Sequence, residues 1–334
     1  MPPSPSAETK AEPRTAVPAA PLLRVDGLHV TVGDGSREAV HDVSFTVQRG
    51  EAVGLVGESG SGKTLTCRSI LGVLPKGCAV GAGTIDLGGV ELTGLTRRQW
   101  DGVRGRTLGA VFQDPASYLN PSITVGRQLA ESLRVAAGLP RARARTRAVE
   151  LLDSVGLRDP ATVYHRYPDE LSGGMLQRAL IAIAIGGEPD LLIADEATTA
   201  LDVVIQAEVL DLLARLRAES GLSLLLVTHD LAVVAETCDR VLVFYAGELV
   251  ESGPTAQVLR SPAHPYTEAL LRLAGPGSAE VLPGQPPPAG AKPPGCRFAD
   301  RCAYAEDRCT AGPVTLRSPG ENRAARCVRV EEES

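Results

Sequence analysis

The sequence is poor in aromatic residues, and it lacks both a long apolar run and an excess of positive charge. Aromatic residues make up 3% of the 334 residues, so we expect a core of Leu, Val, Ile and Ala. No apolar run approaches the roughly 18 residues of a membrane-spanning helix, since the longest, at 179–185 and 222–227, are too short. The net charge of −6 argues against a nucleic-acid-binding protein, because neutralising phosphates requires a basic surface.

The N-terminal segment also lacks the pattern of a secretion signal. It has no basic stretch followed by an apolar one. Residues 1–21 instead place prolines among Ala, Ser, Glu and Thr, a composition that cannot bury a core. We therefore expect a disordered tail on a cytosolic protein, whose contact with a membrane would go through another protein.

Composition divides the rest of the chain into three parts. In residues 22–274 apolar strands alternate with helices, which is typical of an α/β fold. Residues 115–185 lack the strand pattern and predict an inserted helical subdomain. Residues 275–295 are rich in proline and glycine and predict a semi-extended linker. Residues 296–334 form a short cysteine-bearing extension.

The apolar pattern predicts four buried strands and two prominent helices. The strands are expected at 52–56, 191–194, 222–227 and 240–245, and their near-continuous apolar character suits a sheet covered on both faces. One helix is expected from Lys63 to Leu74, ended by Pro75. The other is expected over 203–219, before Gly221. Its helical spacing places one set of side chains on one side: Val204, Val209, Leu212, Leu213 and Leu216.

A basic run lies in the predicted helical subdomain, at 141–147. We interpret this run as the solvated face of a helix, because alternating arginines of this kind are much more often solvated than bound to nucleic acid.

A complete phosphate-binding loop separates the first of these strands from the first helix. Eight residues fit G-x-x-x-x-G-K-[ST]: Gly57, Glu58, Ser59, Gly60, Ser61, Gly62, Lys63 and Thr64. The glycines let successive backbone N–H groups face the phosphates. Lys63 would supply positive charge to the β- and γ-phosphates, Thr64 a hydroxyl to Mg²⁺, and the helix its positive dipole end.

Two carboxylates follow another buried strand. The strand at 191–194 places Asp195 and Glu196 at the carboxyl edge of the sheet, where nucleotides bind in such folds. Asp195 would hold Mg²⁺ through its water shell. Glu196 would take a proton from the attacking water or orient it.

A second helix N-terminus suited to binding an anion lies at Ser172, Gly173 and Gly174, before a helical run from Met175. The serine hydroxyl, the backbone N–H groups and the helix dipole make an anion site. A simple N-capped helix start would have the same sequence. Because the chain already has a phosphate loop, a second anion site would be redundant within one subunit.

Together these motifs resemble the ATP-binding cassette (ABC) ATPases, over about residues 22–270. The resemblance implies a P-loop ATPase fold that hydrolyses ATP with Mg²⁺, in a head-to-tail dimer where residues 172–174 cap the γ-phosphate held by the opposite subunit. It implies that Gln113 is the Q-loop glutamine, which senses Mg²⁺ and connects to the transmembrane partner. It implies that Leu201 and Asp202 form the D-loop at the dimer seam, and that His229 is the switch histidine contacting the γ-phosphate.

Two positions depart from the family pattern. Ala197 stands where the family usually has proline after the Asp-Glu pair, and no functional group is lost there. Val32 stands where the family commonly stacks an aromatic side chain on adenine, so weaker stacking is expected.

Four peripheral segments resemble bacterial dipeptide/oligopeptide importer ATPases: residues 111–121, 198–202, 264–271 and 295–302. This resemblance implies a second, different ATPase subunit, two permeases and an extracytoplasmic solute-binding protein. It places the chain at the cytoplasmic side of the plasma membrane. Nickel importers belong to the same broader group, so the cargo stays open. A soluble ABC ATPase acting on ribosomes or DNA is disfavoured by the single cassette and the acidic balance.

The seven cysteines fall into two groups. Cys67, Cys78 and Cys238 are scattered, and we expect small buried apolar side chains there. The other four have the spacing C-x5-C-x6-C-x17-C: Cys296, Cys302, Cys309 and Cys327.

These four thiols suit one tetrahedral zinc ion, one [4Fe–4S] cluster or no metal. Disulfides are disfavoured in the cytosol. Resemblance to cysteine-bearing members of the importer group favours the [4Fe–4S] cluster. The interleaved Arg297, Arg301 and Arg308 could offset its negative charge.

Overall fold

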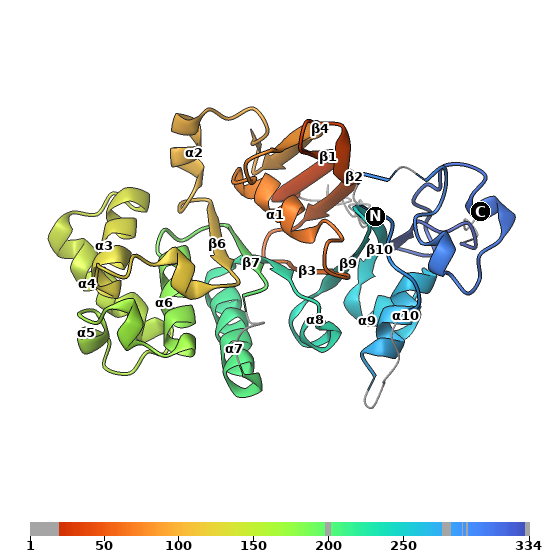
Figure 1. Ribbon diagram of the computed structural model, residues 1–334. Coiled ribbons are helices and arrows are strands. Elements are labelled where there is room, and N and C mark those ends of the chain that lie inside the picture. The colour runs from red at the N-terminus through yellow and green to blue at the C-terminus, as the bar shows by residue number, and fades with distance from the viewer. Residues whose placement is uncertain (1–19, 198–201, 276–281, 289, 292, 331–334) are drawn as a thin grey trace, which may run out of the picture.

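The computed structural model describes residues 20–197, 202–275, 282–288, 290–291 and 293–330 (Figure 1). The predicted N-terminal tail lies almost wholly outside this part of the chain, and so does Leu201 of the expected D-loop. Within the described ranges, no helix combines the length and apolarity needed to cross a membrane.

A seven-stranded sheet forms the centre of the protein, in the order β11-β10-β9-β3-β8-β7-β6. Its strands are β3 (Ala52–Val56), β6 (Leu108–Phe112), β7 (Leu191–Asp195), β8 (Ser223–Val227), β9 (Arg240–Tyr245), β10 (Glu248–Pro254) and β11 (Ala324–Ala325). The run from β9 to β6 is parallel, and β10 and β11 add antiparallel strands at one edge. The four predicted apolar strands are confirmed as β3, β7, β8 and β9.

A second, antiparallel sheet has the order β2-β1-β4-β5. Its strands are β1 (Leu23–Val32), β2 (Arg37–Val47), β4 (Cys78–Leu87) and β5 (Val90–Glu91). The sequence pattern did not predict it as a unit. Register shifts interrupt β1 after Val25 and again after Leu28, so the in–out alternation that identifies a half-buried strand is broken.

The main sheet separates two apolar cores. Val53 and Leu55 point into the core shared with the antiparallel sheet and α1, whereas Ala52 and Val56 point into the core shared with the other helices. This alternation explains why every residue of β3 is buried. On the first side lie α1 (Lys63–Leu71) and α2 (Arg97–Val103). On the other side lie α7 (Val203–Ser220), α8 (Leu231–Thr237), α9 (Thr255–Arg260) and α10 (Pro265–Leu273) (Figure 1).

A group of helices lies beyond the β6 edge of the sheet (Figure 1). It contains α3 (Val125–Ala136), α4 (Arg141–Ser154), α5 (Pro160–Val163) and α6 (Gly173–Ile185), with 3₁₀ turns at Pro115–Tyr118 and Pro168–Glu170. Arg141, Arg143 and Arg145 of α4 are exposed, and Arg147 is half-buried. The basic run therefore lies mostly on an exposed face of the helix.

Three local predictions were wrong. α1 ends at Leu71, three residues earlier than expected, because Gly72 adopts φ +61° as its left-handed cap and Trp100 packs closely on it. Val204 does not share the buried side of α7, since 67% of it is exposed. Cys78 is half-buried at the start of β4, whereas Cys67 and Cys238 are buried as expected.

The C-terminal extension packs against the β10 edge of the main sheet. β11 pairs with β10, and 3₁₀ turns form at Ala299–Arg301 and Asp307–Cys309. Phe298 is buried against Tyr245 and Tyr266. The described residues of 275–295 contain no helix or strand.

Candidate functional site

The phosphate loop follows the buried strand β3 and leads into α1. Gly57, Gly60 and Gly62 have φ values of +146°, +77° and +101°, which only glycine adopts readily. At Gly57 a Cβ atom would also lie 2.1 Å from the carbonyl oxygen of Phe244. The loop therefore requires glycine for its backbone shape and for its close approach to β9.

Lys63 is the buried cation of this loop. Its Nζ donates hydrogen bonds to the carbonyl oxygens of Gly57 (2.7 Å) and Glu58 (3.0 Å) and to Ser61 Oγ (3.3 Å). Burial lowers the pKa of Lys63, and the nearby carboxylates of Glu196 and Asp195 oppose that shift. The ammonium is thus held by the inner face of the loop, through two backbone carbonyl oxygens and one hydroxyl.

Two strand ends bring the predicted magnesium ligands together. Thr64, at the start of α1, donates from Oγ1 to Asp195 Oδ1 at 3.2 Å. Asp195 is the last residue of β7 and is buried, and this burial raises its pKa while the bond from Thr64 opposes the rise. A hydroxyl beside a buried carboxylate is an oxygen-rich pair of the kind that Mg²⁺ prefers.

Glu196 lies one residue beyond β7 in a strained backbone conformation. Its φ is +51°, and its N–H donates to the carbonyl oxygen of Val227, the last residue of β8. This bond ties the end of β7 to the end of β8, two residues before His229. Strain of this kind concentrates at functional sites.

Gln113 directly follows β6, His229 lies two residues beyond the end of β8, and both are exposed. The structure therefore places Gln113, Asp195, Glu196 and His229 along one sheet edge, at the carboxyl ends of three adjacent parallel strands.

The second helix N-terminus predicted to bind an anion, at residues 172–174, does not lie beside the phosphate loop. Ser172 caps α6, and its Oγ accepts from the N–H of Met175 at 3.4 Å. Ser172 and Gly173 are exposed. Figure 1 places α6 in the helical group, away from α1. The structure therefore does not bring this start to the chain's own phosphate loop.

The predicted D-loop aspartate lies beside that second start. Asp202 caps α7 by accepting from the N–H of Ile205 at 2.9 Å. A Cβ atom on Gly174 would lie 2.8 Å from Ile205 Cγ2, so the starts of α6 and α7 are in contact. Val32, the expected counterpart of the adenine-stacking aromatic, is half-buried at the end of β1.

The four C-terminal cysteines gather in one place. They line a small pocket together with His264 and Phe298. Burial raises the pKa of Cys302 and of Cys327, and it raises that of Cys296 to about 11. His264 is also buried, and its Nε2 has no hydrogen-bond partner. The long spacing in sequence thus folds into a single thiol cluster.

The sulfur spacing bears on which metal would fit. In the described chain, one group of three metal-ligand side chains has all its ligand atoms within 4.8 Å of one another, namely His29, Glu38 and His41 on β1 and β2. Sequence reasoning did not single these residues out. The cysteines do not meet that spacing, although sulfurs on one zinc ion lie about 3.8 Å apart.

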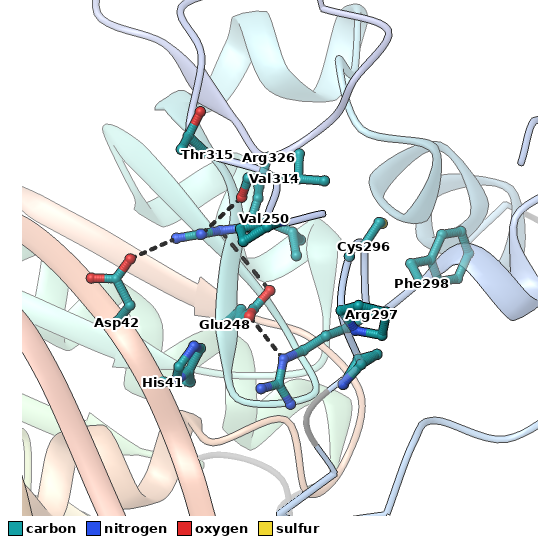
Figure 2. A pocket seen from close by; sticks show the side chains of 14 residues that line it. His41, Asp42, Glu248, Val250, Cys296, Arg297, Phe298, Val314, Thr315 and Arg326 are labelled. Carbon is teal, nitrogen blue, oxygen red and sulfur yellow. Dashed lines mark hydrogen bonds and ion pairs between the residues drawn. The ribbon is translucent and has the colours of Figure 1, made fainter. Parts of the chain in front are cut away.

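The expected role of the interleaved arginines was wrong. Each is paired with a carboxylate: Arg297 with Glu248 at 2.8 Å, Arg301 with Glu58 at 2.8 Å and Arg308 with Glu306 at 2.9 Å. Their charges are therefore already matched by protein groups. Figure 2 shows Arg297 and Arg326 on either side of Glu248, in a pocket of about 250 Å³ between β2 and the extension.

Comparison with known proteins places this geometry in a family. A family model described as "ABC transporter" matches residues 40–199. A relative from Brucella abortus, named as a peptide import ATP-binding protein, is 46% identical and covers 93% of this chain and 98% of its own. The chain belongs to the ABC ATPases. A Brucella melitensis relative with the same descriptive name is 44% identical and covers 92% of this chain and 95% of its own.

This ABC ATPase also carries a second family segment. A model described as "Oligopeptide/dipeptide transporter, C-terminal region" matches residues 250–309, which include three of the four clustered cysteines.

Solved structures agree with the fold. The dimeric ATP-binding cassette MJ0796 bound to ADP and phosphate has a TM-score of 0.62 at 26% identity, covering 70% of this chain and 98% of that one. Clostridium perfringens cbiO1, part of the ABC transporter complex cbiONQ, has a TM-score of 0.63 at 27% identity, covering 72% and 91%.

Proposed function

We propose that this ABC ATPase is the ATP-hydrolysing subunit of an importer for dipeptides or oligopeptides. The observation that carries the proposal is the match of residues 250–309 to the oligopeptide/dipeptide transporter C-terminal region. The nucleotide-binding core does not specify a cargo, because one fold serves many functions. The relatives' descriptive names point to the same cargo class.

The strand-end geometry supports a division of labour at the ATP site. The loop from Gly57 to Thr64 would hold the phosphates, with Lys63 on the β- and γ-phosphates. Thr64, Asp195 and Gln113 would hold Mg²⁺, directly or through water. Glu196 would orient the attacking water and accept its proton, and His229 would contact the γ-phosphate.

The exposed start of α6 supports a site shared between two chains. Ser172, Gly173 and Gly174 would cap the ATP held by another subunit, with Asp202 at the seam beside them. ATP then joins the two subunits and hydrolysis separates them, which is a two-state switch biased by the γ-phosphate. We propose that the second subunit is a different ABC ATPase.

The remaining partners would be two permeases and an extracytoplasmic solute-binding protein, with this chain at the cytoplasmic side of the plasma membrane. Support comes from a mostly apolar groove beside Gln113, lined by residues that include Phe112, Tyr118 and Ile183. Tyr118 is 50% exposed and stacks on Phe112. The groove offers a permease a surface directly linked to the Q-loop glutamine.

For the four clustered cysteines we propose a [4Fe–4S] cluster. Cys296, Cys302, Cys309 and Cys327 would hold it, and when bound it would supply a structural or electron-carrying centre. The small pocket that all four cysteines share supports a common ligand for them. Because burial raises the pKa of Cys296, Cys302 and Cys327, loading a metal group onto these thiols would release protons. Protein prepared without oxygen should contain iron and absorb near 400 nm. Zinc in a colourless preparation, or metal-free thiols, would contradict the cluster.

Transport itself tests the proposed function. Cells lacking this gene should lose uptake of labelled dipeptides or oligopeptides, and the wild-type gene should restore uptake whereas a Glu196→Gln gene should not. Nickel uptake lost with peptide uptake intact would favour the nickel importer. Protein that fails to co-purify with membrane permeases and leaves both uptakes intact would favour a soluble ABC ATPase.

A further inference from the structure

Glu58, the second residue of the phosphate loop, is held at three points. Its carbonyl oxygen accepts from Lys63 Nζ at 3.0 Å, and its N–H donates to the Tyr266 hydroxyl at 2.8 Å. Its carboxylate forms a two-pronged ion pair with Arg301. Only the first contact comes from the loop itself, since Tyr266 lies on α10 and Arg301 in the C-terminal extension.

The ion pair has the geometry of a strong one. Arg301 Nη1 donates to Glu58 Oε2 at 2.8 Å and Nη2 donates to Oε1 at 3.0 Å. The Arg301 side chain is 4% exposed, and that of Glu58 is 29% exposed. Parallel charge-assisted bonds fix orientation as well as distance. Arg301 also donates to the Tyr245 hydroxyl at 3.1 Å and to the carbonyl oxygen of Pro283 at 2.9 Å, so its own position is fixed.

The extension that carries Arg301 is firmly attached to the main sheet. Arg297 pairs with Glu248 of β10, and both side chains are largely buried (Figure 2). Arg323 pairs with Glu251 at 3.0 Å, and Glu251 is fully buried. These contacts, with the pairing of β11 and β10, place Arg301 on a rigid base beside the loop.

The loop needs such support because its own backbone is permissive. Three of its eight residues are glycines with positive φ, and glycine carries the largest conformational freedom in the absence of restraint. Restraints that hold a site in its binding conformation raise affinity by lowering the ordering cost of binding. Arg301 and Tyr266 act on the loop from outside it.

Charge adds a second effect. The Glu58 carboxylate belongs to a loop built to receive phosphates, and an unpaired carboxylate there would repel them. Like charges a few ångströms apart near a protein surface repel each other much more strongly than they do in bulk water. Arg301 offsets that charge through its two bonds to the carboxylate.

We propose that Arg301 is a positioning residue of the ATP site. It locks Glu58 and neutralises its charge, so that the C-terminal extension forms an outer wall of the phosphate loop and sets the affinity for ATP. The proposal rests on the proposed role of the loop in ATP binding. It gives the extension a function in the ATPase that does not depend on what the cysteine pocket holds.

A mutant cycle on the full chain tests this role by titration with MgATP. Arg301→Met should weaken ATP binding about tenfold, because a charge-assisted pair is lost and Glu58 is left unpaired. Glu58→Gln alone should weaken it about threefold. The double variant should bind no more weakly than Glu58→Gln, because removing the carboxylate removes the repulsion. Arg301→Lys should fall between wild type and Arg301→Met.

The extension supplies a matched control. Arg308 also directly precedes a cysteine, but it is 60% exposed and pairs with Glu306 inside the extension. Arg308→Met should therefore leave ATP affinity unchanged. If Arg301→Met does not fold, Glu58→Asp tests the same contact from the loop side. The shorter side chain of aspartate should break the two-pronged ion pair and weaken ATP binding about fivefold.

The outcomes separate this proposal from the ATP site on which it rests. Wild-type ATP affinity in Arg301→Met would overturn the proposal, and so would a double variant as weak as Arg301→Met. A lower melting temperature with unchanged ATP affinity would show a purely structural pair and would also overturn it. Lys63→Ala serves as the reference: if its ATP affinity were also unchanged, the proposed ATP site itself would fail.

Discussion

Two helices of this protein begin with sequences typical of phosphate binding, and these two starts differ in their surroundings. α1 begins with Lys63, which is 4% exposed and bonded to the loop that precedes it. α6 begins after Ser172, which is exposed together with Gly173. The first start combines a buried lysine with the predicted magnesium ligands Thr64 and Asp195, whereas the second is an exposed surface. This difference underlies the proposal that one chain carries two halves of an ATP site, which its own fold keeps apart.

Substitution of Glu196, the predicted general base, gives the largest expected effect. Glu196→Gln should lower ATP turnover of the assembled transporter by about 10²–10⁴-fold, because the general base is lost. ATP binding should persist, since no phosphate contact is removed, and a closed pair of subunits should accumulate. Steady-state hydrolysis together with the mass of the complex in ATP checks both. Turnover close to wild type would remove Glu196 from its role.

Glycine substitutions probe the two starts separately. Gly57→Ala should lower the free energy of unfolding by about 3 kcal/mol or more, because φ is +146° and the new Cβ would meet the backbone at 2.1 Å. Gly174→Ala should cost about 1 kcal/mol, since its Cβ meets only the Ile205 side chain. Urea titrations measure both values.

A compensating change sharpens this contrast. Adding Ile205→Ala should relieve the contact made by Gly174→Ala, because the clashing methyl group is gone. No second substitution should rescue Gly57→Ala, since the carbonyl oxygen of Phe244 belongs to the backbone. Equal losses of unfolding free energy in Gly57→Ala and Gly174→Ala would contradict this difference between the two helix starts.

Lys63, at the start of α1, should contribute to the binding of MgATP. Lys63→Ala should weaken MgATP binding by about 10- to 100-fold, because charge-assisted hydrogen bonds contribute about 1.5–3 kcal/mol. Lys76 is the matched control, since it is exposed just beyond α1, and Lys76→Ala should bind ATP like wild type. Nucleotide titration of the isolated chain makes the comparison. Similar affinities in the two variants would contradict an ATP site at α1.

The predicted base-stacking position, Val32, gives the smallest expected effect. Val32 is half-buried at the end of β1, and Val32→Tyr would supply the missing aromatic surface. Stacking on a base contributes about 1 kcal/mol or more, so ATP should bind about fivefold more tightly. Affinity for inorganic tripolyphosphate, which has no base, should not change. A parallel gain for tripolyphosphate would show an effect unrelated to stacking.

Features set by local sequence were predictable, and features set by distant contacts were not. The phosphate loop, the four apolar strands and α7 follow from spacing within a few residues. The antiparallel sheet was missed because shifts in register break the alternation of β1, and α1 stops early because Gly72 packs beneath Trp100.

The contact between Arg301 and Glu58 joins residues 243 positions apart, so no local pattern reveals it. The sequence placed Arg301 beside a cysteine and suggested a role there. Folding turned its side chain toward the phosphate loop instead.

The most direct test of two separate half-sites is the MgATP affinity of the isolated chain carrying Ser172→Glu. If the exposed start of α6 serves another chain's nucleotide, the affinity of Ser172→Glu should match wild type, while Lys63→Ala should bind about 10- to 100-fold more weakly. A loss in Ser172→Glu comparable to that in Lys63→Ala would show that both starts bind the same ATP, and would contradict the shared site.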